Sequence, residues 1–213
     1  PGTTLICIEN THNRAGGAVT SLSTMAEYRR VADKHGIALH MDGARAFNAA
    51  VALGVSIGDL LASVDSASLC LSKGLRSPVG SILVGSESLI DRARIWRKRL
   101  GGGMRQAGIL AACGLVSLRT CVDRLAEDHA HCQRLAEAIG ALPGLSTSPG
   151  SNPTNLCLID TETEAAEWAS RLHAAGVWCF PVASHRLRLV THADVSSEDV
   201  EHAIGVFESL ARG

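Results

Sequence analysis

Short apolar runs alternate with longer segments of helical periodicity along the first part of the chain. The runs at residues 5–8, 37–41 and 66–71 are too short for helices, and each ends in polar residues, which is typical of buried parallel strands. Residues 24–36 and 44–53 lie between these runs and carry apolar side chains at approximately helical spacing. The order strand, helix, strand, helix, strand predicts a parallel sheet flanked by helices.

Capping residues mark the ends of the two predicted helices. Thr24 and Glu27 have the spacing of a capping box, so we expect the first helix to begin at Thr24. Gly36 and Gly54 follow the two helical segments, at the position where glycine commonly closes a helix.

The rest of the chain predicts a second, smaller domain. Residues 80–84 form a strand candidate, residues 86–100 a basic helix, and residues 106–142 a helical stretch interrupted near Val122. Beyond Pro143 the pattern becomes a mixture of short strands and helices, with strands expected at 155–159, 177–180 and 187–190 and helices at 164–175 and 197–210.

These elements predict an α/β fold. Residues 1–118 are expected to form the remainder of a large domain with a mostly parallel sheet, residues 119–142 a connecting helix, and residues 143–213 a small α+β domain.

Composition narrows the class of protein. The 213 residues are 46% hydrophobic and 19% charged, which excludes a disordered chain, and the net charge of −1 provides no overall field for nucleic acid or anionic lipid. Residues 107–116 form the longest apolar stretch, far shorter than the roughly 20 residues of a membrane span. The seven cysteines are odd in number and include no Cys-x-x-Cys pair, so we expect reduced thiols, no metal site and a cytoplasmic protein.

Polar residues follow three of the predicted strands, namely His12, Asp42 and Lys73. Ligands of doubly wound sheets bind outside the carboxyl ends of the strands. Lys73 directly follows an apolar strand, where we expect its ammonium group to be poorly hydrated. Desolvation favours a neutral amine that can form a Schiff base with a carbonyl compound. The alternative is a strand-end lysine that points into water.

Asp42 ends the strand expected beside that of Lys73. Pyridoxal phosphate enzymes place a carboxylate against the pyridine nitrogen, which keeps the ring protonated and able to accept electrons. Arg45 lies three residues further on and is a candidate for the phenolic oxygen of the ring. An aspartate at a helix start beside a surface arginine is the structural alternative for this pair.

Four segments, in this order, resemble the low-specificity L-threonine aldolases, which are pyridoxal phosphate enzymes of the aspartate-aminotransferase-like fold type I. The segments are Glu-Asn-Thr-His-Asn with the following Gly-Gly at 9–17, His-Met-Asp-Gly-Ala-Arg at 40–45, Cys-Leu-Ser-Lys-Gly-Leu at 70–75, and Arg-Lys-Arg-Leu-Gly-Gly-Gly-Met-Arg-Gln at 97–106. The resemblance implies cleavage of L-threonine or L-allo-threonine to glycine and acetaldehyde. Phenylserine cleavage, racemisation and a non-catalytic truncated chain remain alternatives.

The resemblance also implies a role for each site residue. Lys73 bonds covalently to the pyridoxal phosphate aldehyde, Asp42 pairs with the pyridinium nitrogen, and Arg45 contacts the ring oxygen. His12 lies near the β-hydroxyl group of the substrate and is the candidate base. Arg188 binds the substrate carboxylate with its guanidinium fork, and Arg186 is the alternate for that role.

Subunit contacts are implied as well. The basic helix and the Gly-Gly-Gly segment at 101–103 resemble the part that family members extend across a subunit interface, where Lys98 and Arg105 approach the cofactor phosphate of a neighbour. The alternative is a flexible connector after a solvated helix. We therefore expect a homo-oligomer, a dimer of dimers, that acts on a small amino acid.

The start of the chain departs from the family. Pro1 is not an initiator methionine, and the family carries upstream a phosphate-binding turn and a histidine that stacks on the cofactor. We therefore expect an N-terminally truncated chain with an incomplete cofactor pocket and an exposed sheet edge or face.

Overall fold

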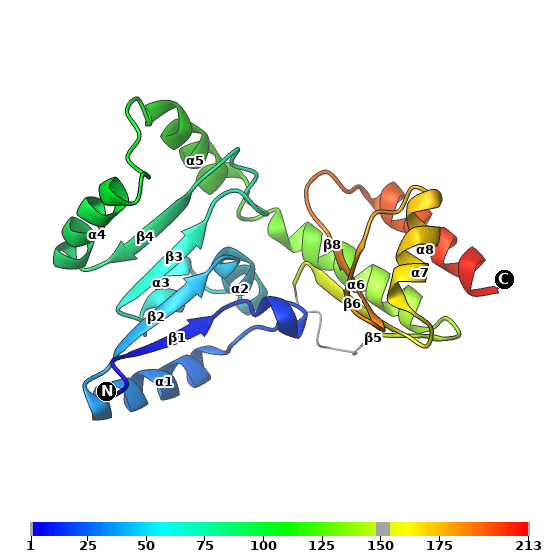
Figure 1. The fold of residues 1–213 in the computed structure, drawn as a ribbon, viewed down its shortest axis with the longest axis horizontal. Helices are drawn as coiled ribbons and strands as arrows, with labels where there is room; N and C mark the ends of the chain where they lie inside the picture. The colour runs from blue at the N-terminus through cyan, green and yellow to red at the C-terminus, as the bar shows by residue number, and fades with distance from the viewer. Residues whose placement is uncertain (1, 148–153, 213) are drawn as a thin grey trace. The chain divides into compact units, whose positions relative to one another are not determined.

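The computed structural model describes residues 2–147 and 154–212, and the chain divides into two compact units (Figure 1). The first unit consists of Pro1–Thr11 and Thr20–Arg124, and the second of His12–Val19 and Leu125–Gly213. The change of unit thus falls between Arg124 and Leu125, within the predicted connecting helix at 119–142. The segment His12–Val19, which the sequence placed in the large domain, is assigned to the second unit.

The sheet of the first unit is mostly parallel, as predicted. Its strand order is β1-β2-β3-β4. β1 (Leu5–Glu9), β2 (Ala38–Gly43) and β3 (Ser66–Cys70) are parallel, and β4 (Ser81–Gly85) is antiparallel to β3. Because the parallel strands are in register, their carboxyl ends lie at the same edge of the sheet.

The helices of the first unit largely follow the capping signals. Gly36 and Gly54 close α1 and α2 in the left-handed conformation, as predicted. The predicted start at Thr24 is wrong, because Ser21 accepts a hydrogen bond from the backbone N–H of Thr24 at 3.2 Å and caps a helix that begins at Leu22, two residues earlier. The short α3 was not predicted. The helices are α1 (Leu22–His35), α2 (Ala46–Leu53), α3 (Ile57–Leu61), α4 (Glu87–Arg99) and α5 (Gly108–Thr120).

One face of the first sheet carries the core of this unit. Leu39 and Met41 on β2 are fully buried, and they alternate with the less buried His40 and the exposed Asp42. β1 lies at the sheet edge, and its Leu5 is 47% exposed.

The second unit contains an antiparallel sheet of order β5-β6-β8-β7. The strand expected at 177–180 is misplaced, since β7 begins at Phe180, and β5 was not predicted. The other predicted elements are confirmed within a few residues. The bounds are α6 (Leu125–Gly140), β5 (Leu145–Thr147), β6 (Leu156–Thr161), α7 (Ala165–Ala174), β7 (Phe180–Ala183), β8 (Arg186–Val190) and α8 (Ser197–Arg212).

The two faces of the second sheet differ sharply in burial. Ile159 on β6 and Leu187 on β8 are fully buried, and they pack in one apolar cluster with Phe207 of α8. Burying each such side chain contributes about 1.5–3 kcal/mol. The side chains that alternate with them, among them Arg186 and Arg188, lie on the opposite face.

Two further findings concern the chain as a whole. All seven cysteines are free thiols. Within residues 2–147 and 154–212, no helix combines the length and the apolar character that a membrane crossing requires.

Candidate active site

Asp42 lies near the carboxyl end of β2, and Lys73 follows β3, the adjacent parallel strand. β2 and β3 pair with Asp42 opposite Ser68. β3 ends at Cys70, and Lys73 comes three residues later. One carboxylate oxygen of Asp42 accepts a hydrogen bond from the backbone N–H of Ala44 at 3.0 Å. The bond orients the carboxylate at the strand end, while the side chain stays exposed.

Lys73 lies in a tight turn that begins at Leu71 and ends at Ser77. The backbone N–H of Ser77 donates to the carbonyl of Leu71 at 3.0 Å, and that of Arg76 donates to the carbonyl of Lys73 at 2.9 Å. Buried Leu71 and Leu75 anchor the turn. Lys73 itself is exposed, so the expectation of a poorly hydrated ammonium group is wrong for this chain. Buried leucines fix the backbone here, and the amine is left accessible.

Three more predicted cofactor residues lie in the first unit. Arg45 is half-buried at the N-cap position of α2. Lys98 is exposed in the last turn of α4, and Arg105 is exposed beyond the glycine segment. The chain folds closely against the helix end there, because a Cβ atom on Gly103 would lie 2.7 Å from the Cδ atom of Lys98.

The His12–Val19 segment is a short excursion whose two ends are tied by Asn10. The buried amide of Asn10 donates to the carbonyl of Thr20 at 3.2 Å and accepts from its N–H at 3.1 Å. Within the excursion, Gly17 has a φ of 77° and accepts a hydrogen bond from the Thr154 hydroxyl at 3.0 Å. A side chain at Gly17 would collide with that hydroxyl, so the glycine is required for this packing.

His12 caps the short 3₁₀ helix Asn13–Ala15. Its Nδ1 atom accepts a hydrogen bond from the backbone N–H of Ala15 at 3.1 Å. A ring nitrogen that accepts cannot also carry a proton, so the neutral ring of His12 has its proton on Nε2. In this arrangement His12 can donate from Nε2, but it can take up a proton only if the cap opens.

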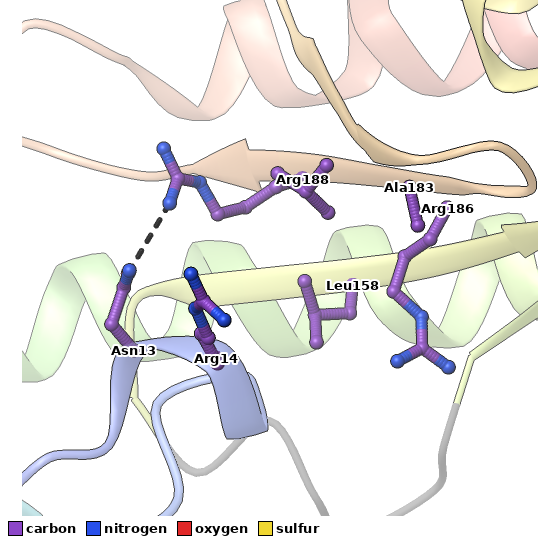
Figure 2. A pocket seen from close by; sticks show the side chains of 7 residues that line it. Asn13, Arg14, Leu158, Ala183, Arg186 and Arg188 are labelled. Carbon is purple, nitrogen blue, oxygen red and sulfur yellow. Dashed lines mark hydrogen bonds between the residues drawn. The ribbon is translucent and has the colours of Figure 1, made fainter.

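A cavity of about 490 Å³ lies over the polar face of the second sheet (Figure 2). Its volume falls in the range of small-molecule sites. Arg188 lies opposite Leu158 in the strand register, and Arg186 lies opposite Asp160. The lining residues are Asn13, Arg14, Leu158, Val182, Ala183, Arg186 and Arg188.

The two strand arginines have different partners. Arg186 donates to both carboxylate oxygens of Asp160, at 2.6 and 2.9 Å, and these hydrogen bonds raise the pKa of the Arg186 guanidinium above its ordinary value. Its charge is thereby compensated. Arg188 donates from Nη1 to the side-chain oxygen of Asn13 at 3.3 Å, as the dashed line in Figure 2 marks. The Asn13 amide is neutral, so this hydrogen bond does not compensate the positive charge of Arg188 at the cavity. Arg188 is therefore favoured over Arg186 for binding an anion.

Sequence reasoning missed the partners of both arginines. Asn13 was noted only as part of a motif, and Asp160 was not singled out. Asp160 directly follows the strand predicted at 155–159 and is two residues after Leu158. The alternation of side chains along a strand could have placed both on one face. Asn13 offered no such signal, because it is 175 residues from Arg188 in sequence.

Comparison with known proteins finds relatives over most of the chain. A family model described as beta-eliminating lyase matches residues 1–162. The chain is 42% identical over 214 residues to the probable low-specificity L-threonine aldolase 2 of Arabidopsis thaliana, covering 99% of this chain and 60% of that protein. It is 42% identical over 199 residues to the low specificity L-threonine aldolase of Escherichia coli K12, covering 93% and 57%.

A solved structure shows the same fold. The crystal structure of a putative L-allo-threonine aldolase from Listeria monocytogenes superposes with a TM-score of 0.82 at 21% identity, covering 95% of this chain and 60% of that one. This chain thus spans about 60% of the length of the relatives it matches first.

Proposed function

Because the chain belongs to the beta-eliminating lyase family, we propose that it is part of a pyridoxal phosphate-dependent carbon–carbon lyase. The reaction is the cleavage of L-threonine or L-allo-threonine to glycine and acetaldehyde. The observation that carries the proposal is the placement of an accessible amine, Lys73, and an oriented carboxylate, Asp42, at the carboxyl ends of adjacent parallel strands. The threonine aldolase names of the relatives from Arabidopsis thaliana and Escherichia coli support the same reaction.

The donor set fits pyridoxal phosphate. A primary amine is the group that captures an aldehyde, and Lys73 is exposed in a hydrogen-bonded turn. One oxygen of Asp42 is held by Ala44, which orients the other to accept from a protonated ring nitrogen. Half-buried Arg45 is the candidate for the ring oxygen. When bound, pyridoxal phosphate supplies an electron sink for the bond that breaks.

In this proposal Arg188 binds the substrate carboxylate through its guanidinium fork. Arg186 is not suited to the role, because Asp160 already occupies it in a bidentate pair. A carboxylate fixed in this way restricts rotation of the amino acid and sets which bond at Cα can break.

His12 is the proposed contact to the β-oxygen of the substrate. Its Nε2–H group can donate to that oxygen while the Ala15 cap stays intact. Acting as the base requires that Nδ1 release the cap first. The role of His12 as the base stays a prediction.

We also propose that the exposed surface around α4 pairs with a second copy of the chain. Large apolar side chains are exposed there, with Trp96 at 56% and Leu100 at 80%. Monomeric proteins rarely expose such groups together. Lys98 and Arg105 lie on the same stretch, so pairing would bring two cations to a neighbour's cofactor phosphate. Sedimentation of the protein at several concentrations tests this, and a dimer of dimers is expected.

Seven free thiols support a reducing compartment, and we propose the cytoplasm.

The decisive experiment adds pyridoxal phosphate to the protein and follows the visible absorption of the bound cofactor. Borohydride reduction and peptide mass spectrometry should then locate the pyridoxyl group on Lys73. Products from L-threonine, L-allo-threonine, phenylserine and alanine distinguish the aldolase from another activity of the same cofactor. Failure to bind the cofactor would favour a non-catalytic chain.

A further inference from the structure

Arg188 lies at the cavity and donates a hydrogen bond to a neutral side chain, that of Asn13. We propose that Asn13 is a positioning residue, which holds the Arg188 guanidinium in the orientation that receives the substrate carboxylate. The inference rests on the proposed function, in which Arg188 binds that carboxylate.

The first argument is the number of contacts that fix Arg188. An arginine side chain has several rotatable bonds, and its charged end is mobile unless something holds it. The Nε atom of Arg188 is buried and has no hydrogen-bond partner among the described residues. The bond that the structure gives to its guanidinium is the one to Asn13, at 3.3 Å. Orientation of the charged group therefore depends on Asn13.

The second argument is chemical and comes from the neighbouring arginine. Asp160 holds Arg186 with a carboxylate, which orients the guanidinium but also cancels its charge. The amide oxygen of Asn13 accepts a hydrogen bond and carries no net charge. Asn13 thus orients Arg188 and leaves its positive charge available to an incoming carboxylate.

The third argument is the rigidity of the support. Asn13 begins the 3₁₀ helix that His12 caps. The same segment is tied to the start of β6 by the hydrogen bond from Thr154 to Gly17, and β6 pairs with the strand that carries Arg188. The side-chain hydrogen bond of Thr154 and the backbone pairing of β6 with β8 therefore hold Asn13 and Arg188 in one frame.

The test measures binding of glycine and glycinamide to the cofactor-loaded protein through the change in cofactor absorption. The two ligands differ in the carboxylate that Arg188 binds. With Asn13→Ala, the dissociation constant for glycine should rise about tenfold, the loss expected for one hydrogen bond to a charged group. The constant for glycinamide and the spectrum of the unliganded protein should not change. Gln133→Ala, which removes an exposed amide hydrogen bond on α6, is the matched control and should change neither ligand.

Asn13→Asp keeps the acceptor and the shape of the side chain, so it also serves if the alanine variant folds poorly. It should weaken glycine binding at least as much as alanine does, because the new charge neutralises Arg188. Recovery of wild-type affinity in Asn13→Asp, or equal losses for glycine and glycinamide in Asn13→Ala, would overturn the inference. If the wild-type protein binds both ligands equally and Arg188→Lys changes neither, the assignment of Arg188 fails, and the proposal for Asn13 fails with it.

Discussion

The sheets of the two units present their polar residues in different ways. In the first unit, Asp42 lies near the end of one parallel strand, Lys73 follows the next, and both are exposed. In the second unit, Arg186 and Arg188 lie within a strand, on the face opposite the core, and each has a side-chain partner from another segment. Groups placed at strand ends are accessible for covalent chemistry, whereas groups placed along a strand are held at fixed spacing for recognition.

The comparison predicts that substitutions at the strand ends of the first unit change activity and leave stability almost unaffected. Lys73→Ala should lower turnover of L-threonine by about 10³-fold or more, because it removes the covalent link to the cofactor. The free energy of unfolding should change by less than about 0.5 kcal/mol, as expected for an exposed side chain. Steady-state rates and urea unfolding measure both. A large loss of stability would show that Lys73 is part of the packing.

Asp42→Asn is expected to have the next largest effect on rate. The amide keeps the oxygen that accepts from Ala44 but loses the charge opposite the ring nitrogen. Turnover should fall by about 10²-fold, in line with loss of one electrostatic contact in an active site, while the cofactor still binds. Near-normal rates would remove Asp42 from its proposed role.

Gly17→Ala is expected to lower stability, unlike the substitutions at the strand ends, because it acts on the packing of the second unit. The positive φ alone costs about 1–2 kcal/mol for alanine, and the collision with Thr154 adds to that cost. Gly176→Ala is the control, since Gly176 has a φ of 85° and open space around it. Unfolding monitored by tryptophan fluorescence, to which buried Trp168 contributes, should show the larger loss of stability for Gly17→Ala. Equal losses would mean that the Thr154 contact adjusts without cost.

Substitutions of His12 separate its two ring nitrogens. Asparagine places an acceptor near the position of Nδ1 and preserves the cap, whereas glutamine places an N–H donor near the position of Nε2. If His12 donates from Nε2, His12→Gln should retain several-fold more activity than His12→Asn. Large and similar losses of activity in both variants would support His12 as the base. Full activity in His12→Asn would mean that the role of His12 is to cap the 3₁₀ helix. The measurement is kcat for L-threonine.

The smallest expected effect concerns Asp65 in the first unit, a carboxylate held from two sides. Its Oδ2 atom accepts from the backbone N–H of Leu39 at 2.7 Å and from Arg29 at 2.8 Å. These bonds, that of Leu39 foremost, hold the pKa of Asp65 below its ordinary value.

The lowered pKa gives the Asp65 contribution a defined dependence on pH. The stabilisation is fully present above the ordinary carboxyl pKa of about 3.9 and is lost as the pH falls through the lower value of the folded state. Asp65→Asn should therefore cost less than about 1 kcal/mol at neutral pH, since the side chain is half exposed and screened. Urea unfolding should show this cost vanishing in acid. A cost that persists in acid would show that the charge is not its source.

Features of the site that depend on residues close together in the sequence could be predicted, and features that depend on distant residues could not. The position of Lys73 after its strand was predicted from a short apolar run, because a strand end is a local feature of the sequence. The strand predicted at 37–41 extends to Gly43, so Asp42 lies within it near its end. The poor hydration expected for Lys73 was wrong, because burial depends on what the rest of the chain places over the turn. The start of α1 was missed because Thr24 and Ser21 are both capable caps and only the observed hydrogen bond decides between them.

By itself, the sequence determined most of the elements and the mostly parallel first sheet, since periodicity and capping are encoded within a few residues. The choice of Lys73 and Asp42 as amine and acid stays a prediction. Only the tertiary structure decided that Asp160 neutralises Arg186, that Asn13 holds Arg188, and that residues 12–19 belong with the second unit. The physical reason is that these relations join segments up to 175 residues apart. Strand register and close packing bring such segments together, and neither can be read from local pattern.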